Sequence, residues 1–152
     1  MGRAIKVRAS ALASDPYTDR DLVMPDVNSC TRIAVKEAYE QAGLGAEDIN
    51  LVELHDCFAT AEMLHYENLG LCKDGDAGKM IDDGDVELSG RIPVNVSGGL
   101  LSKGHPLGAT GIANIYEVCT HLRGEAGKRQ VDGAKIGMTH VIGLGTACAI
   151  HI

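Results

Sequence analysis

The chain has 152 residues, of which 45% are hydrophobic, and a formal net charge of −7 at pH 7. A chain of this length fits one compact domain, residues 1–152, and can bury about 70% of its unfolded surface. The acidic balance argues against nucleic-acid binding, which needs a basic face. No run approaches the ~18 apolar residues of a membrane span. The five cysteines include no C-x-x-C pair and indicate reduced thiols.

The first part of the chain predicts a strand, a loop and a helix. A weak alternation over residues 5–12 indicates a strand, and the polar residues 16–26, with two prolines, indicate a loop. Residues 1–26 therefore lead into the domain. A helical pattern covers residues 27–42, with Gly43 as its C-terminal cap. Four apolar residues of this helix are predicted to share one face: Ile33, Ala34, Ala38 and Ala42.

A second strand and helix follow. Residues 49–54 predict a strand, and residues 59–69 predict a helix that Gly70 closes. Residues 73–90 are rich in glycine and aspartate and predict an irregular, exposed excursion. Residues 92–96 predict another strand, at an edge of the sheet because of its proline.

The last part predicts a helix and two strands. Pro106 suits the first turn of the helix, whose predicted inner face is Ile112, Ile115, Cys119 and Leu122. Strands are predicted over residues 135–142 and 146–152, around the turn 143–145. The resulting order, β-α-β-α-β-α-β-β, is typical of an α/β domain with a mixed or mostly parallel sheet flanked by helices. Functional sites in such sheets lie beyond the carboxyl ends of strands, where three loops of this chain should converge.

The first of these loops is His55-Asp56-Cys57-Phe58, between a strand and a helix. The unpaired backbone N–H groups and the dipole of a helix N-terminus favour a thiolate, so Cys57 in the first helical turn is a candidate for acid–base chemistry. A neutral His55 can exchange a proton with it or donate to an oxyanion. The structural alternative, a half-buried histidine beside a small buried thiol, is equally compatible with these residues.

The second loop precedes the last predicted helix. Gly104 allows an unusual backbone angle before His105, which at a helix N-terminus stays neutral and can act as a base. Several glycines, including Gly98 and Gly99, allow backbone and ligand to approach closely. The alternative is a glycine-rich turn with a capping histidine. Residues 99–104 have P-loop glycine spacing, but His-Pro replaces the Lys-Ser/Thr that nucleotide triphosphates need.

The third loop offers weaker candidates. His140 comes just before a glycine turn and could face the site with the backbone N–H of Gly143 beside it. A histidine on a sheet edge is an almost equally good interpretation. His55, Cys57 and Cys72 match no structural zinc spacing, so we predict no metal site.

At these motifs the chain resembles the thiolase superfamily, and most closely its sterol-carrier-protein-2 type. The resemblance covers nearly everything from Val27 onward and is carried by four strings: residues 55–58, 95–111, 122–130 and 143–145. It implies the C-terminal half of a thiolase, a β-α-β-α-β-α-β-β unit. The implied reaction is reversible Claisen cleavage and condensation of 3-oxoacyl-CoA, with coenzyme A as a substrate and no covalently bound cofactor.

The resemblance also implies roles for individual residues. His105 would activate an acylated cysteine of the N-terminal half, and His55 would bind the thioester oxygen where enolate charge develops. Cys57 would be the acid and base at the substrate α-carbon. His140 stands where other thiolases carry a second cysteine, with the weaker candidate Gly143 after it. Three further residues are expected to bind substrate: Ser97, Gly98 and Gly99.

The acylated cysteine itself is missing from the chain. We therefore expect a thiolase N-terminal half as partner, from the same gene or as a separate chain, and a homodimer in the complete enzyme. Two alternatives remain: a thiolase-like retro-aldolase acting on steroid side-chain CoA esters, and a non-catalytic subunit or scaffold. We expect a cytoplasmic protein if the source is prokaryotic and a peroxisomal one if it is eukaryotic.

Overall fold

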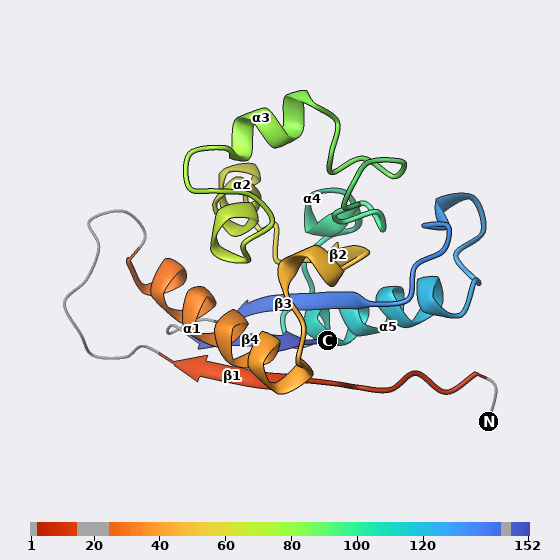
Figure 1. Ribbon diagram of the computed structural model, residues 1–152, viewed down its shortest axis with the longest axis horizontal. Coiled ribbons are helices and arrows are strands. Elements are labelled where there is room, and N and C mark those ends of the chain that lie inside the picture. Colours follow the sequence, from red (N-terminus) through yellow and green to blue (C-terminus); the bar gives the residue numbers. More distant parts are fainter. Residues whose placement is uncertain (1–2, 15–24, 144–146) are drawn as a thin grey trace.

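A four-stranded mixed sheet forms the centre of the domain (Figure 1). Its strands are β1 Ser10–Ser14, β2 Leu51–Glu53, β3 Gly137–Gly143 and β4 Ala147–His151. Their spatial order is β1-β4-β3-β2; β4 pairs antiparallel with β1 and β3, and β2 pairs parallel with β3. The computed structural model describes residues 3–14, 25–143 and 147–152. The predicted mixed α/β architecture is confirmed.

Two of the helices cover the faces of this sheet. The helices are α1 Pro25–Ala42, α2 Ala59–Asn68, α3 Ala77–Asp82, α4 Gly99–Lys103 and α5 Thr110–Leu122. α1 packs against β1 and β4, and α5 packs against β2 and β3 from the other side (Figure 1). Met138 of β3 lies in the main core with α1, whereas Gly137 faces α5, where an added Cβ would come 2.5 Å from Val118 Cγ1. No helix in the described part of the chain is long and apolar enough to cross a membrane.

The main core lies between α1 and the sheet. Small residues spaced four apart along α1 let the helix lie close to the strands: Cys30, Ala34, Ala38 and Ala42, all buried. The prediction that Ile33 shares this face is wrong, because its side chain is 44% exposed. Gly43 has φ +65° and its N–H bonds the Tyr39 carbonyl, so the predicted C-terminal cap is confirmed.

The inner face of α5 agrees only in part with the predicted one, since Ile115, Cys119 and Leu122 are partly buried and Ile112 is exposed. The buried residues of this helix are Thr110, Asn114, Glu117, Val118 and His121. The prediction followed the apolar residues, but Ile112 is 69% exposed and points away from the sheet. Some of these polar groups find partners at the sheet: Asn114 Nδ2 lies 3.4 Å from the His140 carbonyl oxygen, although Asn114 Oδ1 has no partner among the described residues. Ile112 and Tyr116 therefore lie outward, whereas Val118 is buried and Leu122 is partly buried against the smaller core.

Several predicted strand boundaries also differ. The first strand begins at Ser10 rather than at residue 5, and it pairs with β4 from Ser10 opposite His151 to Ser14 opposite Ala147. The predicted strand 92–96 is only an isolated parallel bridge from Val94 to Val52, since Asn95 has φ +50° and ends the extended run. Strands β2 and β3 lie within one or two residues of their predicted bounds.

The predicted loops and helix starts need similar corrections. The predicted excursion 73–90 contains α3, whose Ala77 and Met80 are buried, so it is neither wholly irregular nor wholly exposed. Pro25 opens α1, while the rest of the predicted loop, residues 16–24, lies outside the described residues. The predicted turn 143–145 also lies largely outside them.

Candidate active site

Two of the predicted loops meet at the carboxyl end of β2. His55 lies two residues beyond that strand, and His105 lies between α4 and α5. Their imidazole rings are in edge-to-face contact, with centroids 4.8 Å apart and planes at 86°. Fifty residues of sequence separate two histidines that the fold brings into contact.

His55 is buried, and His140 holds its backbone in place. Its backbone N–H donates to His140 Nδ1 at 3.4 Å, and its side chain is only 5% exposed. Burial, together with the neighbouring His105, lowers the pKa of His55, so the ring is neutral at pH 7. Its buried Nδ1 has no hydrogen-bond partner among the described residues. An unpaired acceptor costs less there than an unpaired donor, so we assign the ring proton to Nε2.

His105 is exposed, and a neighbouring hydroxyl orients its ring. His105 Nδ1 lies 2.7 Å from Thr110 Oγ1, and this hydroxyl donates its own proton to the Pro106 carbonyl at 3.3 Å. We therefore assign Thr110 Oγ1 as the acceptor and the His105 proton to Nδ1. Nε2 is left with a lone pair, as a general base requires. The predicted helix start at Pro106 is wrong: α5 begins at Thr110, so His105 precedes the helix by five residues.

Cys57 is partly exposed and precedes α2 rather than beginning it. The helix starts at Ala59 with Phe58 as its N-cap, so the prediction that Cys57 lies in the first turn is wrong. The extended backbone of Phe58 delays the first helical turn. Cys57 remains a free thiol two residues from His55.

His140 faces the interior instead of the solvent. Its side chain is fully buried, and its ring packs against His65 with centroids 4.1 Å apart. Burial and the neighbouring histidines lower the pKa of His140 well below its usual value. Nδ1 accepts the His55 N–H, so the ring proton is on Nε2, where it bonds Thr31 Oγ1 at 3.3 Å. His140 supports the backbone of His55, and Gly143 ends β3 next to residues outside the described set.

The three predicted substrate-binding residues open α4. Ser97 Oγ donates to Glu53 Oε2 at 2.6 Å, so this hydroxyl is engaged within the protein. Gly98 and Gly99 have φ of +96° and +60°. A Cβ on Gly99 would lie 2.0 Å from Asp56 Oδ2, so this glycine makes room for a carboxylate of the protein itself.

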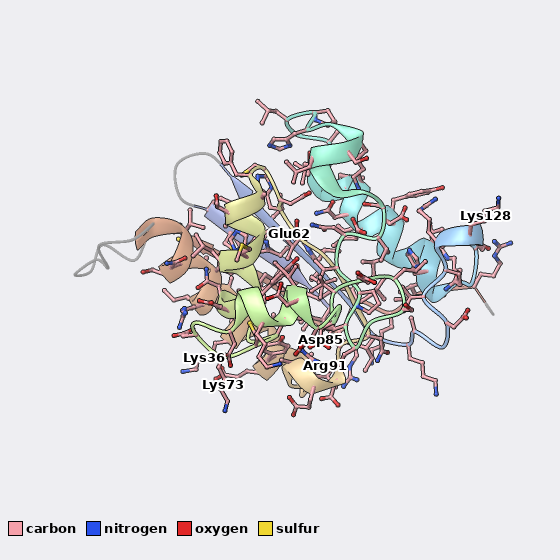
Figure 2. The ribbon with its side chains drawn as sticks, turned by 90° about the horizontal axis from the view of Figure 1, so that it is seen from above. Lys36, Glu62, Lys73, Asp85, Arg91 and Lys128 are labelled. Atoms are coloured by element: carbon pink, nitrogen blue, oxygen red, sulfur yellow. The ribbon has the colours of Figure 1, made fainter. Side chains whose placement is uncertain are left out.

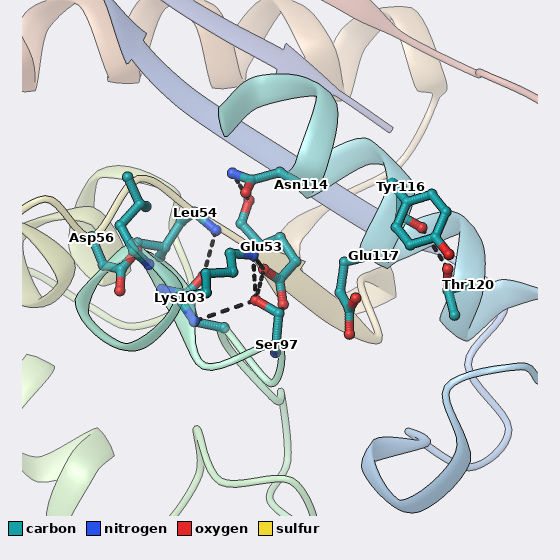
Figure 3. A network of polar contacts seen from close by, with 12 residues as sticks. Glu53, Leu54, Asp56, Ser97, Lys103, Asn114, Tyr116, Glu117 and Thr120 are labelled. Carbon is teal, nitrogen blue, oxygen red and sulfur yellow. Dashed lines mark hydrogen bonds and ion pairs between the residues drawn. The ribbon is translucent and has the colours of Figure 1, made fainter. Parts of the chain in front are cut away.

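Sequence reasoning missed two carboxylates and a lysine beside the site. Asp56 is buried and accepts the N–H groups of Leu100 (2.8 Å) and Leu101 (3.3 Å) at the start of α4. Glu53 is fully buried at the end of β2 and contacts Lys103 (Figure 3). A glutamate inside the mostly apolar run 49–54 is the signal that could have revealed the Glu53 contact.

Asn95 connects the same strand end to α2. Its Oδ1 accepts the Leu54 N–H at 2.8 Å, and its Nδ2 donates to Glu62 at 3.3 Å. Figure 2 shows Glu62 within the domain, whereas Lys36 and Lys128 point outward. Burial raises the pKa of Glu62, whereas the hydrogen bonds from Tyr66 and Asn95 act against that shift. The described residues contain no cluster of three or more metal-ligating side chains.

Comparison with known proteins agrees with this arrangement. Residues 18–152 match the family described as thiolase C-terminal domain-like. The chain is 44% identical to sterol carrier protein 2 of Rattus norvegicus, over 99% of this chain and 28% of that protein. It is 49% identical to an acetyl-CoA acetyltransferase of Methanothermobacter thermautotrophicus, over 97% of this chain and 39% of that protein.

A solved structure titled Ltp2-ChsH2(DUF35) aldolase superposes with a TM-score of 0.77 at 26% identity, covering 95% of this chain and 38% of that one. The chain thus spans 28% to 39% of the length of these relatives. The predicted family is confirmed: the chain belongs to the thiolase superfamily, in which it corresponds to the C-terminal domain.

Proposed function

We propose that this chain is the C-terminal catalytic half of a 3-oxoacyl-CoA thiolase and supplies His55, Cys57 and His105 to a nucleophilic cysteine outside it. The observation that carries the proposal is the contact between the His55 and His105 rings, whose assigned tautomers have opposite capacities. His105 offers a lone pair on Nε2, and His55 offers an N–H on Nε2. A thiol to be deprotonated and an oxygen to be stabilised require that combination.

In the proposed thiolysis, His105 takes the proton of the external cysteine, whose thiolate attacks the 3-oxo carbonyl carbon. Cleavage of the bond between the α- and β-carbons leaves an acyl-cysteine and the enolate of acetyl-CoA, whose oxygen accepts the His55 N–H. Cys57 gives its proton to the α-carbon. Coenzyme A then passes its thiol proton to the Cys57 thiolate and takes the acyl group, and His105 returns its proton to the released cysteine.

The chain's own thiols do not supply the nucleophile in this scheme. Cys30 and Cys148 are fully buried in the main core, and burial raises the pKa of Cys148 to about 12. Cys57 already serves the α-carbon. The outward apolar side of α5, with Ile112 and Tyr116 both 69% exposed, offers a surface for the proposed thiolase N-terminal half.

The test is thiolysis of acetoacetyl-CoA by the purified chain, alone and together with a thiolase N-terminal half encoded beside it or fused to it. We expect negligible turnover alone and substantial turnover of the assembly. His105→Ala and His55→Ala should each abolish most of the activity of the assembly. Robust cleavage by the chain alone would contradict the proposed division of labour, and an inactive assembly would favour a scaffold.

A second candidate, retro-aldol cleavage of a CoA ester, is favoured by the likeness to the aldolase structure. Such a reaction needs no acylated cysteine and no thiol as acyl acceptor. Cleavage of a β-hydroxyacyl-CoA ester in the absence of free coenzyme A, with no thiolysis in its presence, would replace the thiolase proposal with this one. The motif 55–58 carries the cysteine of the thiolase pattern, and this resemblance favours the thiolase.

A further inference from the structure

The segment that carries His105 is exposed along its whole length. Every residue from Leu101 to Ala109 is exposed, whereas Thr110 is buried. A segment with so little buried surface is not held by packing. Its position relative to His55 must therefore depend on polar contacts.

Glu53 grips both ends of α4, the helix that leads into this segment. Its Oε1 accepts the backbone N–H of Ser97 at 3.1 Å, and its Oε2 accepts the Ser97 hydroxyl at 2.6 Å. At the other end of the helix, Lys103 Nζ lies 3.4 Å from Oε2 and donates to Ser97 Oγ at 2.6 Å. Figure 3 shows this closed network at the end of β2, two residues before His55.

The buried carboxylate of Glu53 depends on its polar partners in this network. Burial raises the pKa of Glu53, and the contacts with Ser97 and Lys103 act against that shift. A fully buried carboxylate has to keep its partners, because an unpaired charge there is strongly unfavourable. The Lys103 side chain is 30% exposed, so most of it lies against the protein, where Glu53 and Ser97 are its polar partners. Only Gly104, with φ +89°, separates Lys103 from His105.

We propose that Glu53 and Lys103 are positioning residues that hold His105 against His55. The inference rests on the proposed function only in treating His105 as the catalytic base. Asp56 anchors the N-terminal turn of α4, and the Glu53–Lys103 contact fixes its C-terminal end, directly before His105. In the proposed reaction neither residue exchanges a proton with the substrate.

The first test is Lys103→Met in this chain, followed by NMR. The amides of the α4 segment, residues 100–104, should exchange about tenfold faster, since one charged anchor is lost. The ring-to-ring NOE between His55 and His105 should disappear. The titration midpoint of His55 should rise, because the neighbouring His105 contributes to lowering it. Unchanged ring contact and unchanged titration would overturn the proposal.

The matched control is Lys79→Met, which makes the same chemical change in an exposed i,i+4 pair with Asp83. This variant should change none of these readouts. Ser97→Ala is the second variant should Lys103→Met not fold. It removes the hydroxyl between the two charges without removing either, and should loosen residues 100–104 in the same direction but less.

A double variant separates positioning from simple charge neutralisation. If Lys103 only neutralised Glu53, Glu53→Gln combined with Lys103→Met would restore both the stability and the ring contact of the native chain. We expect the double variant to recover most of the stability while residues 100–104 stay loose and the ring contact stays lost. Full recovery of that contact would overturn the proposal.

Activity of the assembled enzyme gives an independent readout. Lys103→Met should lower kcat for thiolysis about 10- to 100-fold with little change in KM, since misplacement of a base affects the chemical step. Lys79→Met should leave both unchanged. An assembly with no thiolysis in any form would refute the proposed function, while the NMR comparison would still decide whether Glu53 and Lys103 position His105.

Discussion

His140 Nδ1 accepts a hydrogen bond from the backbone N–H of His55 at 3.4 Å, in the fully buried space beneath the site. By resemblance, His140 stands where other thiolases carry a second cysteine. Here its ring supports the main chain of the loop that carries His55. Its remaining nitrogen bonds Thr31 of α1, so His140 connects the site to the main core.

His140→Leu should therefore destabilise the chain by about 1–3 kcal/mol, because the buried His55 N–H and the Thr31 hydroxyl lose a partner. Urea unfolding at pH 7 measures the change. His151→Leu is the control, since His151 makes a similar contact with Thr139 at 3.3 Å on the less buried strand β4, and should cost less than 1 kcal/mol. Equal decreases in the unfolding free energy for the two variants would show that the buried contacts of His140 stabilise the chain no more than the contact of His151.

The histidines should also make the stability depend on pH. Burial lowers the pKa of His65 to about 4, and His55 and His140 shift in the same direction. Below pH 6.5 these histidines bind protons in the unfolded chain but not in the folded chain, so the unfolding free energy falls as pH drops from 6.5 towards 4. For His65 alone the loss approaches about 3 kcal/mol. The raised pKa values of Glu53 and Glu62 act oppositely, lowering stability as pH rises above 4.5.

The measurement is the urea midpoint between pH 4.5 and 7.5 for the native chain and His65→Leu. The variant should have a flatter profile across that range. At pH 7 it should be about as stable as the native chain, because His65 Nδ1 has no partner to lose among the described residues. A profile as steep as that of the native chain would rule out His65 as a source of the pH dependence.

Much of the architecture could be predicted from local patterns. The glycine cap after α1, the strand β2 and the helix α2 all follow from periodicity and turn residues. The loops around His55 and His105 were expected at one rim of the sheet, and they are in contact there. Patterns of this kind act over a few residues, and they succeed where local preference and packing agree.

The errors come from contacts distant in sequence. The apolar residues of α5 predicted its buried side, yet polar residues such as Asn114 face the sheet because β2 and β3 supply partners. The contacts that hold α4 join residues 44 to 50 positions apart, such as Asp56 to Leu100 and Glu53 to Lys103. No spacing rule reports such pairs, and neither loop alone reveals that Gly99 is small to admit Asp56.

The Asp56–Gly99 contact can be tested by a double-mutant cycle. Gly99→Ala should destabilise the chain by about 2–4 kcal/mol, through its positive φ and through the clash with Asp56 Oδ2. In an Asp56→Ala background the clash is gone, and the cost should fall to the backbone part, about 1 kcal/mol. Additive effects in chemical denaturation, with no coupling energy, would contradict a direct contact.

Thr110 should control the tautomer of His105. Thr110→Val removes the acceptor for the His105 Nδ1 proton, so the ring samples both tautomers and Nε2 is less available as a base. Thiolysis by the assembled enzyme should fall about tenfold, while Thr110→Ser, which keeps the hydroxyl, should retain most of the activity. ¹⁵N shifts of His105 report the tautomer directly. Equal activity of the two variants would refute this role.

The outward side of α5 should matter for assembly and not for folding. Ile112→Lys places a charge on a side chain that is already 69% exposed, so the unfolding free energy of the chain should change by less than about 0.5 kcal/mol. The same substitution should prevent binding to the thiolase N-terminal half, because a charge would be buried against an apolar partner surface.

Ile33→Lys is the matched control, since Ile33 is 44% exposed on α1, which covers the opposite face of the sheet. Gel filtration of the mixed halves and thiolysis by the mixture provide the two readouts. Binding should be lost with Ile112→Lys and kept with Ile33→Lys. Loss with Ile33→Lys alone would move the contact to the α1 side, because the charged side chain interferes only where the partner covers it.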